Sequence, residues 1–186
     1  MATRKTAPPK LSEALKTADL LHDRATLLRA IERIGQEITR DYAGSEKPPL
    51  FTTVMNGGLI FAGHLALAIP IDMEFDYVHA TRYRGDTRGG KVAWLKAPHV
   101  PMLNRHVLLI DDILDEGHTL AGVRDHCLEL GAASVRTAVL CDKRHDRRVP
   151  NMTAEYIGVE VPDRYVFGFG MDYYEQGRNL DGVYAI

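Results

Sequence analysis

The chain has 186 residues, of which 45% are hydrophobic, and a formal net charge of −2. This length fits a single domain that buries a core without disulfides or structural metal, and the balanced charge argues against a nucleic acid or a membrane as partner. The two cysteines, Cys127 and Cys141, form neither a C-x-x-C pair nor a metal-ligand cluster, so we expect buried thiols in a cytoplasmic protein.

The N-terminal half contains a predicted helix, then a strand and a second helix. The first residues, MATRKTAPPKL, carry basic residues and prolines but no apolar core, which predicts a loose arm and not a secretory signal. Between Asp23 and about Tyr42, apolar residues recur three and four apart and predict an amphipathic helix. LFTTVM (50–55) predicts a buried strand, which the Gly57-Gly58 turn connects to an apolar helix ending near Ala68.

The same order of strand, turn and helix recurs in the second half. HVLLIDD (106–112) predicts a strand, residues 119–130 a helix, and SVRTAVLC (134–141) another strand. This alternation predicts an α/β fold, with a mostly parallel twisted sheet and helices on both faces. Such sheets bind ligands at the carboxyl ends of their strands, where both glycine turns lie.

Two segments do not follow this order. ATRYRGDTRGGKVAW (80–94) is polar and rich in glycine and arginine, and we interpret it as a lid loop. The tail after Cys141 has short strand signals broken by proline and glycine, which predicts an added substructure. We therefore expect one domain over 1–186, with a core at about 40–145 and a small hood formed by the N-terminal segment and about 150–186.

The stretch VLLIDDILDEGHTL (107–120) places three acids beside a glycine turn. Successive strand side chains point to opposite faces, so Asp111 and Asp112 are expected to converge only at the end of the strand. Carboxylates accept hydrogen bonds from sugar hydroxyls and suit Mg²⁺. The turn at 115–119 and the helix start after it favour a phosphate, although no Walker P-loop is present. Together these features indicate a phosphorylated sugar.

This stretch resembles the signature of the type I phosphoribosyltransferases, and the chain from about residue 10 to its end resembles the hypoxanthine-guanine phosphoribosyltransferases. VMNGGLIF (54–61) is similar to their pyrophosphate loop, TRY (81–83) to their lid, DKR (142–144) to their purine-binding segment, and residues 159–180 to their hood. The resemblance implies transfer of a 5-phosphoribosyl group from its 1-diphosphate to hypoxanthine or guanine, giving IMP or GMP and pyrophosphate, with Mg²⁺ as cofactor. We also expect a homodimer or homotetramer.

The resemblance assigns roles to the acids and the turn. Asp115 would face N7 of the purine and exchange its proton, although an aspartate there is equally suited to cap a helix. Asp111 and Asp112 would meet the ribose hydroxyls and the metal. The 5′-phosphate would be bound by the turn residues Glu116, Gly117, His118 and Thr119.

The remaining roles belong to the pyrophosphate, the lid, the purine and the metal. Pyrophosphate would be bound by Met55, Asn56, Gly57, Gly58 and Arg178, with a cis peptide at Met55-Asn56 and with Asn56 where many relatives carry lysine. Arg82 and Tyr83 would form the lid, where Ser-Tyr is frequent in the family. The purine would be bound by Lys143 at O6, by stacking on Tyr165 and by the backbone of Val166, and Asp172 would reach a second Mg²⁺.

Simpler interpretations and two other functions remain open at this point. Lys143 alone is typical of a surface charge in a basic run, and Tyr165 of strand core. The same fold could transfer phosphoribosyl to xanthine or a pyrimidine instead. It could also belong to a regulatory protein that binds RNA, although the balanced charge argues against it.

Overall fold

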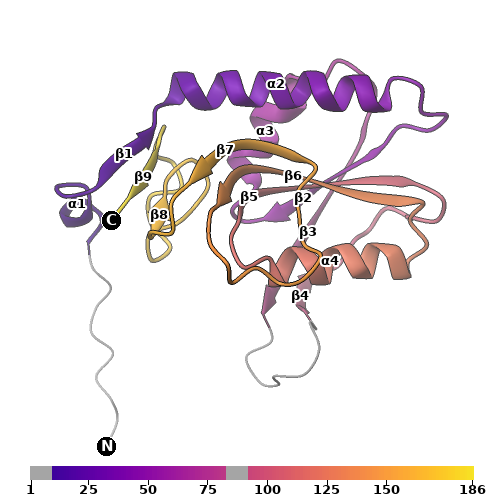
Figure 1. Cartoon of the computed structure of the whole chain (residues 1–186). Coiled ribbons are helices and arrows are strands. Elements are labelled where there is room, and N and C mark those ends of the chain that lie inside the picture. Colours follow the sequence, from indigo (N-terminus) through magenta and orange to yellow (C-terminus); the bar gives the residue numbers. More distant parts are fainter. Residues whose placement is uncertain (1–9, 83–91) are drawn as a thin grey trace, which may run out of the picture.

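The structure is a computed structural model that describes residues 10–82 and 92–186. Its centre is a six-stranded sheet in the order β4-β3-β2-β5-β6-β7 (Figure 1). All neighbouring strands are parallel except the edge strand β4, which runs antiparallel to β3. The strands are β2 (Leu50–Met55), β3 (Glu74–Arg82), β4 (Val92–Lys96), β5 (His106–Leu114), β6 (Ser134–Lys143) and β7 (Tyr156–Val161).

The expected α/β architecture is confirmed, with helices on both faces of the sheet. Helices α2 (Arg24–Tyr42) and α3 (Leu59–Leu67) lie on one face, and α4 (His118–Glu129) lies on the other (Figure 1). Asp23 caps α2, because its carboxylate accepts a hydrogen bond from the Thr26 N–H. The apolar stripe of α2 packs against Phe51, Leu108 and Leu140 of the sheet, and α4 buries Val123 against the opposite face.

Strands β3 and β4 were not predicted from the sequence. The segment 80–94, interpreted as a loop, begins within β3 and ends within β4. β3 lacks the flanking glycine turn that accompanies β2 and β5, although its alternation between polar and apolar residues is typical of a strand. Its Phe75 and Tyr77 are exposed, whereas Val78 is fully buried.

A second sheet is formed by both ends of the chain. It contains β1 (Asp19–His22), β9 (Val183–Ala185) and β8 (Val166–Phe167), which pair antiparallel in this order (Figure 1). The short helix α1 (Leu11–Ala14) precedes β1 in the chain. We call this sheet and its connecting turns the hood. The hood begins later than the expected residue 150, because β7 extends the central sheet by pairing in parallel with β6.

The central strand β5 is longer than the sequence suggested. Its pairing with β2 ends at Ile110, but its pairing with β6 continues to Leu114. The sequence predicted that Asp111 and Asp112 lie at the end of this strand. They lie within it instead. They follow the point where β2 stops pairing with β5, and this position leaves space beside them.

Both cysteines are buried thiols, as expected. Burial raises the pKa of Cys127 to about 12, so this thiol stays protonated and unreactive at neutral pH. In the ranges 10–82 and 92–186, no helix combines the length and the apolar character that crossing a bilayer requires.

Candidate active site

A pocket of about 230 Å³ opens at the carboxyl ends of β2 and β5, beside the start of α4. This is where a parallel sheet of this kind is expected to bind its ligand. Most of the residues predicted from the sequence line the pocket, namely the catalytic Asp115 and members of the pyrophosphate, ribose and phosphate groups, but none of the purine group: Met55, Gly57, Asp111, Asp112, Asp115, Glu116, Gly117, His118, Thr119 and Arg178.

Asp111 and Asp112 lie side by side in the pocket despite their alternation along β5. The Asp112 N–H donates a hydrogen bond to Asp111 Oδ1 at 2.9 Å, and the Asp112 side chain packs on the backbone of Gly57. A Cβ atom at Gly57 would overlap the Asp112 carboxylate, so this position requires glycine. Burial raises the pKa of both carboxyls, and the charge of Asp112 raises the pKa of Asp111 further. Two acids this close, of which Asp112 is buried and Asp111 is partly buried, favour a bound cation.

The turn after β5 leads directly into α4. Gly117 adopts a left-handed conformation (φ 83°) and occupies the N-cap position, so the alternative that Asp115 caps the helix is wrong. The first-turn amides of a helix lack partners within the helix and attract anions. Glu116, Gly117, His118 and Thr119 line the pocket at this helix start, in a position suited to a phosphate.

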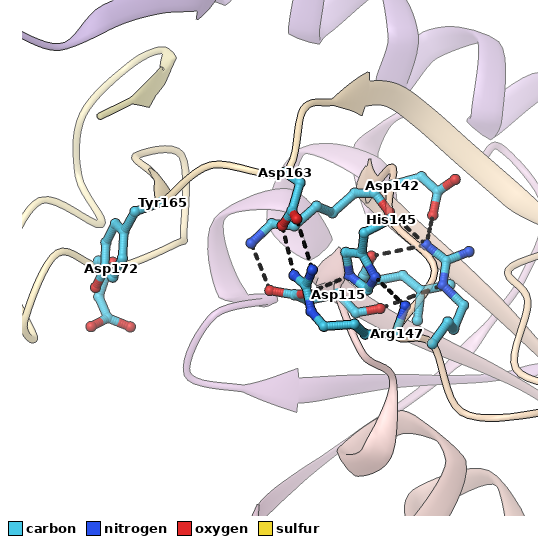
Figure 2. A network of polar contacts seen from close by, with 10 residues as sticks. Asp115, Asp142, His145, Arg147, Asp163, Tyr165 and Asp172 are labelled. Carbon is cyan, nitrogen blue, oxygen red and sulfur yellow. Dashed lines mark hydrogen bonds and ion pairs between the residues drawn. The ribbon is translucent and has the colours of Figure 1, made fainter.

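Asp115 is held between two donors that come from the end of β6 and the loop after it. Lys143 Nζ lies 2.6 Å from Asp115 Oδ2, and His145 Nε2 lies 2.7 Å from Asp115 Oδ1 (Figure 2). Although burial raises the pKa of Asp115, the hydrogen bonds from Lys143 and His145 outweigh it and lower the pKa. The Lys143 side chain is only 10% exposed, so it is not the free surface charge that its basic surroundings suggested.

The pyrophosphate loop contains the expected cis peptide bond between Met55 and Asn56. Met55 and Gly57 line the pocket, whereas the Asn56 side chain is exposed and Gly58 is buried behind the loop. The Gly58 N–H donates to the Val54 carbonyl at 3.0 Å, which closes the turn before α3.

The hood reaches the pocket through Arg178. Its guanidinium donates to the Gly170 carbonyl at 2.9 Å and forms an ion pair with Asp172 at 2.8 Å. Gly170 has a φ of 109° and packs against the Gly57 carbonyl, where a side chain would not fit. Arg178 and Asp172 thus lie together, close to the pyrophosphate loop.

Tyr165 and Val166 lie beside the hood sheet and outside the pocket lining. Tyr165 is 43% exposed, so it is not strand core, and its ring stacks on Tyr174 at a centroid distance of 6.0 Å. Val166 is buried in β8. Figure 2 shows Tyr165 and Asp172 grouped together, well separated from Asp115.

The two lid residues are only partly described. Arg82 ends β3, and its side chain lies outside the described residues. Tyr83 lies outside them entirely.

Three residues around Asp115 received no role from the sequence. His145 contacts its carboxylate, and Arg148 donates to Asp142 at 2.5 Å and to the Lys143 carbonyl at 2.9 Å. Asp142 itself is fully buried. The basic run DKRHDRR (142–148) contains all three. An acid that directly follows the apolar strand segment SVRTAVLC is the signal that could have indicated an internal network.

A comparison with family models identifies the class of protein. Residues 17–176 match the model described as the phosphoribosyl transferase domain. This range includes both glycine turns, the acids of β5 and the Asp115–Lys143 pair. The fold and the pocket are those of a type I phosphoribosyltransferase.

Comparison with similar proteins identifies the family within this class. The hypoxanthine-guanine phosphoribosyltransferase of Streptococcus pneumoniae is 35% identical over 171 residues, which cover 91% of this chain and 92% of that protein. The one from Streptococcus thermophilus is 36% identical over 165 residues, covering 88% and 90%. A crystal structure of the Bacillus anthracis enzyme shares 30% identity, with a TM-score of 0.83 and coverage of 90% of this chain and 98% of that one. The chain belongs to the hypoxanthine-guanine phosphoribosyltransferase family of enzymes.

Proposed function

We propose that this enzyme transfers the 5-phosphoribosyl group of 5-phosphoribosyl 1-diphosphate to hypoxanthine or guanine, giving IMP or GMP and pyrophosphate. The observation that carries the proposal is the Asp115–Lys143 pair, in which a carboxylate and an ammonium group lie 2.6 Å apart at the pocket. The family of the chain supports the reaction class, which is phosphoribosyl transfer in purine salvage.

The pair matches the edge of a 6-oxopurine. Such a base presents N7, which can carry a proton, next to the O6 acceptor, so a carboxylate and an ammonium group side by side complement both. Adenine presents an amino donor at position 6, which would face the Lys143 donor. Asp115 would accept the N7 proton as N9 attacks the ribosyl carbon and the bond to the diphosphate breaks. Its lowered pKa keeps it ionised at neutral pH, as a proton acceptor must be, although the same shift makes it a weaker base.

The phosphate, diphosphate and ribose groups of the substrate would each bind to the part of the pocket that complements them. The 5′-phosphate would lie at the start of α4, against the amides of Gly117, His118 and Thr119. The diphosphate would lie between the Met55–Gly58 loop and Arg178, whose guanidinium can donate two parallel hydrogen bonds. Asp111 and Asp112 would accept hydrogen bonds from the ribose hydroxyls.

Mg²⁺ fits the residues that are present. In the ranges 10–82 and 92–186, no three His, Cys, Asp or Glu side chains gather into a metal site. Mg²⁺ is commonly held by one or two carboxylates, with substrate phosphates and water completing its shell. Asp111 and Asp112 would provide those carboxylates, and Asp172, beside Arg178, would face a second ion. Bound Mg²⁺ would neutralise charge on the leaving diphosphate.

We further propose that the enzyme works in the cytoplasm as a homodimer or homotetramer. The buried, unpaired thiols of Cys127 and Cys141 suit a reducing compartment. Light scattering on the purified protein measures its mass in solution, and a monomer at micromolar concentration would contradict the proposed assembly.

The test of the function is a steady-state assay with phosphoribosyl diphosphate, Mg²⁺ and one base at a time. We expect nucleotide formation with hypoxanthine or guanine and little with adenine. Xanthine and orotate are the comparison bases, because turnover confined to either would replace the proposed substrates. No turnover with any 6-oxopurine would refute the proposal.

A further inference from the structure

His145 is a buried histidine with both ring nitrogens engaged. Its side chain is 2% exposed, and its Nε2 lies 2.7 Å from Asp115 Oδ1. The backbone N–H of Arg147 donates to His145 Nδ1 at 3.0 Å. Because Nδ1 accepts this hydrogen bond, the ring proton must be on Nε2, where it points at Asp115 (Figure 2).

We propose that His145 is a positioning residue that holds the Asp115 carboxylate in the orientation required to face the purine. This inference rests on the function proposed above. With His145 on Oδ1 and Lys143 on Oδ2, both oxygens of the carboxylate are held and its plane is set. Each oxygen keeps a second lone pair for the base.

The hydrogen bonds around His145 fit a neutral imidazole in this place. Lys143 already balances the charge of Asp115, so His145 adds a donor without adding a second cation. A protonated ring would place an Nδ1–H against the Arg147 N–H, and two donors would then face each other. Another charged neighbour, Arg148, directs its guanidinium to Asp142 and to the Leu114 and Asp115 carbonyls, away from the Asp115 carboxylate.

The loop that carries His145 is itself anchored to the segment that connects β7 to the hood. The Arg147 guanidinium forms a two-point ion pair with Asp163, with distances of 2.7 and 2.6 Å. Asp163 lies two residues before Tyr165, the proposed stacking residue. The backbone that fixes the His145 tautomer is therefore connected to the segment that would hold the base.

The first experiment compares His145→Leu with His145→Gln. Leucine fills the buried space without a donor, whereas the glutamine amide can still donate to Asp115. We expect His145→Leu to lower kcat about 10- to 100-fold, with KM for phosphoribosyl diphosphate changed less than about threefold. His145→Gln should retain most of the activity, and equal losses in the two variants would overturn the proposal.

The second experiment asks whether His145 acts through Asp115. In an Asp115→Asn background, His145→Leu should lower kcat by less than about threefold, because the group that it positions is already inactive. Losses that multiply independently would overturn the proposal and indicate a packing role. His106→Gln is the matched control, since His106 also bonds a side chain, Ser134 Oγ at 2.7 Å, but lies at the other end of β5; its kcat should stay at the wild-type value.

A third measurement uses the wild-type protein and needs no variant to fold. Nitrogen-15 spectra of histidine-labelled protein at pH 8 should show His145 with its proton on Nε2, and a proton on Nδ1 would overturn the proposal.

Failure of the proposed function and failure of the role of His145 give different results. A wild-type protein inactive with every 6-oxopurine refutes the proposed function, whereas an active wild type with an equally active His145→Leu variant refutes only the role of His145.

Discussion

At the scale of single residues, the site depends on how three aspartates are surrounded. Asp115 has two donors on its carboxylate and a lowered pKa, whereas Asp111 and Asp112 are buried together and have raised pKa values. The first arrangement suits a group that accepts a proton, and the second suits a group that requires a cation. Three acids within five residues of β5 and its turn therefore have environments that suit different chemistry, as the proposed function requires.

Asp115→Asn tests the first arrangement. Asparagine keeps the shape of the side chain but cannot accept a proton, so we expect kcat to fall about 100-fold or more. KM for phosphoribosyl diphosphate should change less than about threefold, because Asp115 is proposed to face the base and not the diphosphate. Steady-state kinetics with both substrates varied measures the two effects, and an equal loss in both would point to a structural role.

Asp112→Asn tests the second arrangement. A raised pKa in the folded state means that ionisation of the buried carboxyl destabilises the fold as the pH rises above about 4, the unfolded value. At pH 7.5, without metal, the variant should therefore have a higher free energy of unfolding than the wild type while it loses activity. Urea unfolding in EDTA measures this gain. A variant less stable than the wild type at pH 7.5 would contradict the expected sign.

At the scale of elements, one carboxylate connects the β4 edge of the sheet to the segment before β5. Asp76 of β3 accepts hydrogen bonds from Lys96 at 2.7 Å and from the backbone N–H groups of His99 and Val100 at 2.6 and 3.0 Å. Its side chain is 5% exposed. Although burial raises the pKa of Asp76, these hydrogen bonds outweigh it and lower the pKa. Asp76 thus connects β3, β4 and the segment before β5.

Asp76→Asn should destabilise the fold by about 2 kcal/mol at pH 7, because an amide cannot accept all of these hydrogen bonds. A lowered pKa gives stability that is fully present above about 4 and is lost as the pH falls through the folded value. The difference between wild type and variant should therefore shrink at pH 3. Urea unfolding at both pH values measures it, and a difference independent of pH would contradict the argument.

At the scale of the whole molecule, the pocket lies between the central sheet and the hood. Two adjacent hood residues contact the rest of the protein. Gly170 packs against the pyrophosphate loop, and the Phe169 ring stacks on His64 of α3 at a centroid distance of 5.5 Å. Residues 11–22 and 166–185 must both fold to place Arg178 in the pocket, so ligand binding and hood stability are coupled.

Phosphoribosyl diphosphate with Mg²⁺ should therefore stabilise the folded chain. At about 100 times the dissociation constant the gain is about 2.7 kcal/mol, which raises Tm by roughly 5–10 °C. Removing Mg²⁺ with EDTA should abolish most of this shift, because the diphosphate would then face Asp111 and Asp112 without a cation. Thermal unfolding measures both conditions, and an equal shift in EDTA would contradict a role for the metal.

The local sequence was sufficient to predict the α/β class, helix α2, strand β2 and the signature around β5, because each depends on a short periodic pattern or a glycine turn. The cis peptide at Met55-Asn56 was also predicted, through the family resemblance. Three features depended on the tertiary structure: the pairing of β7 with β6, the convergence of Asp111 and Asp112 within a continuing strand, and the contact of His145 with Asp115 across 30 residues of sequence. The physical reason is that strand pairing and side-chain direction are set by neighbours distant along the chain, which no local pattern records.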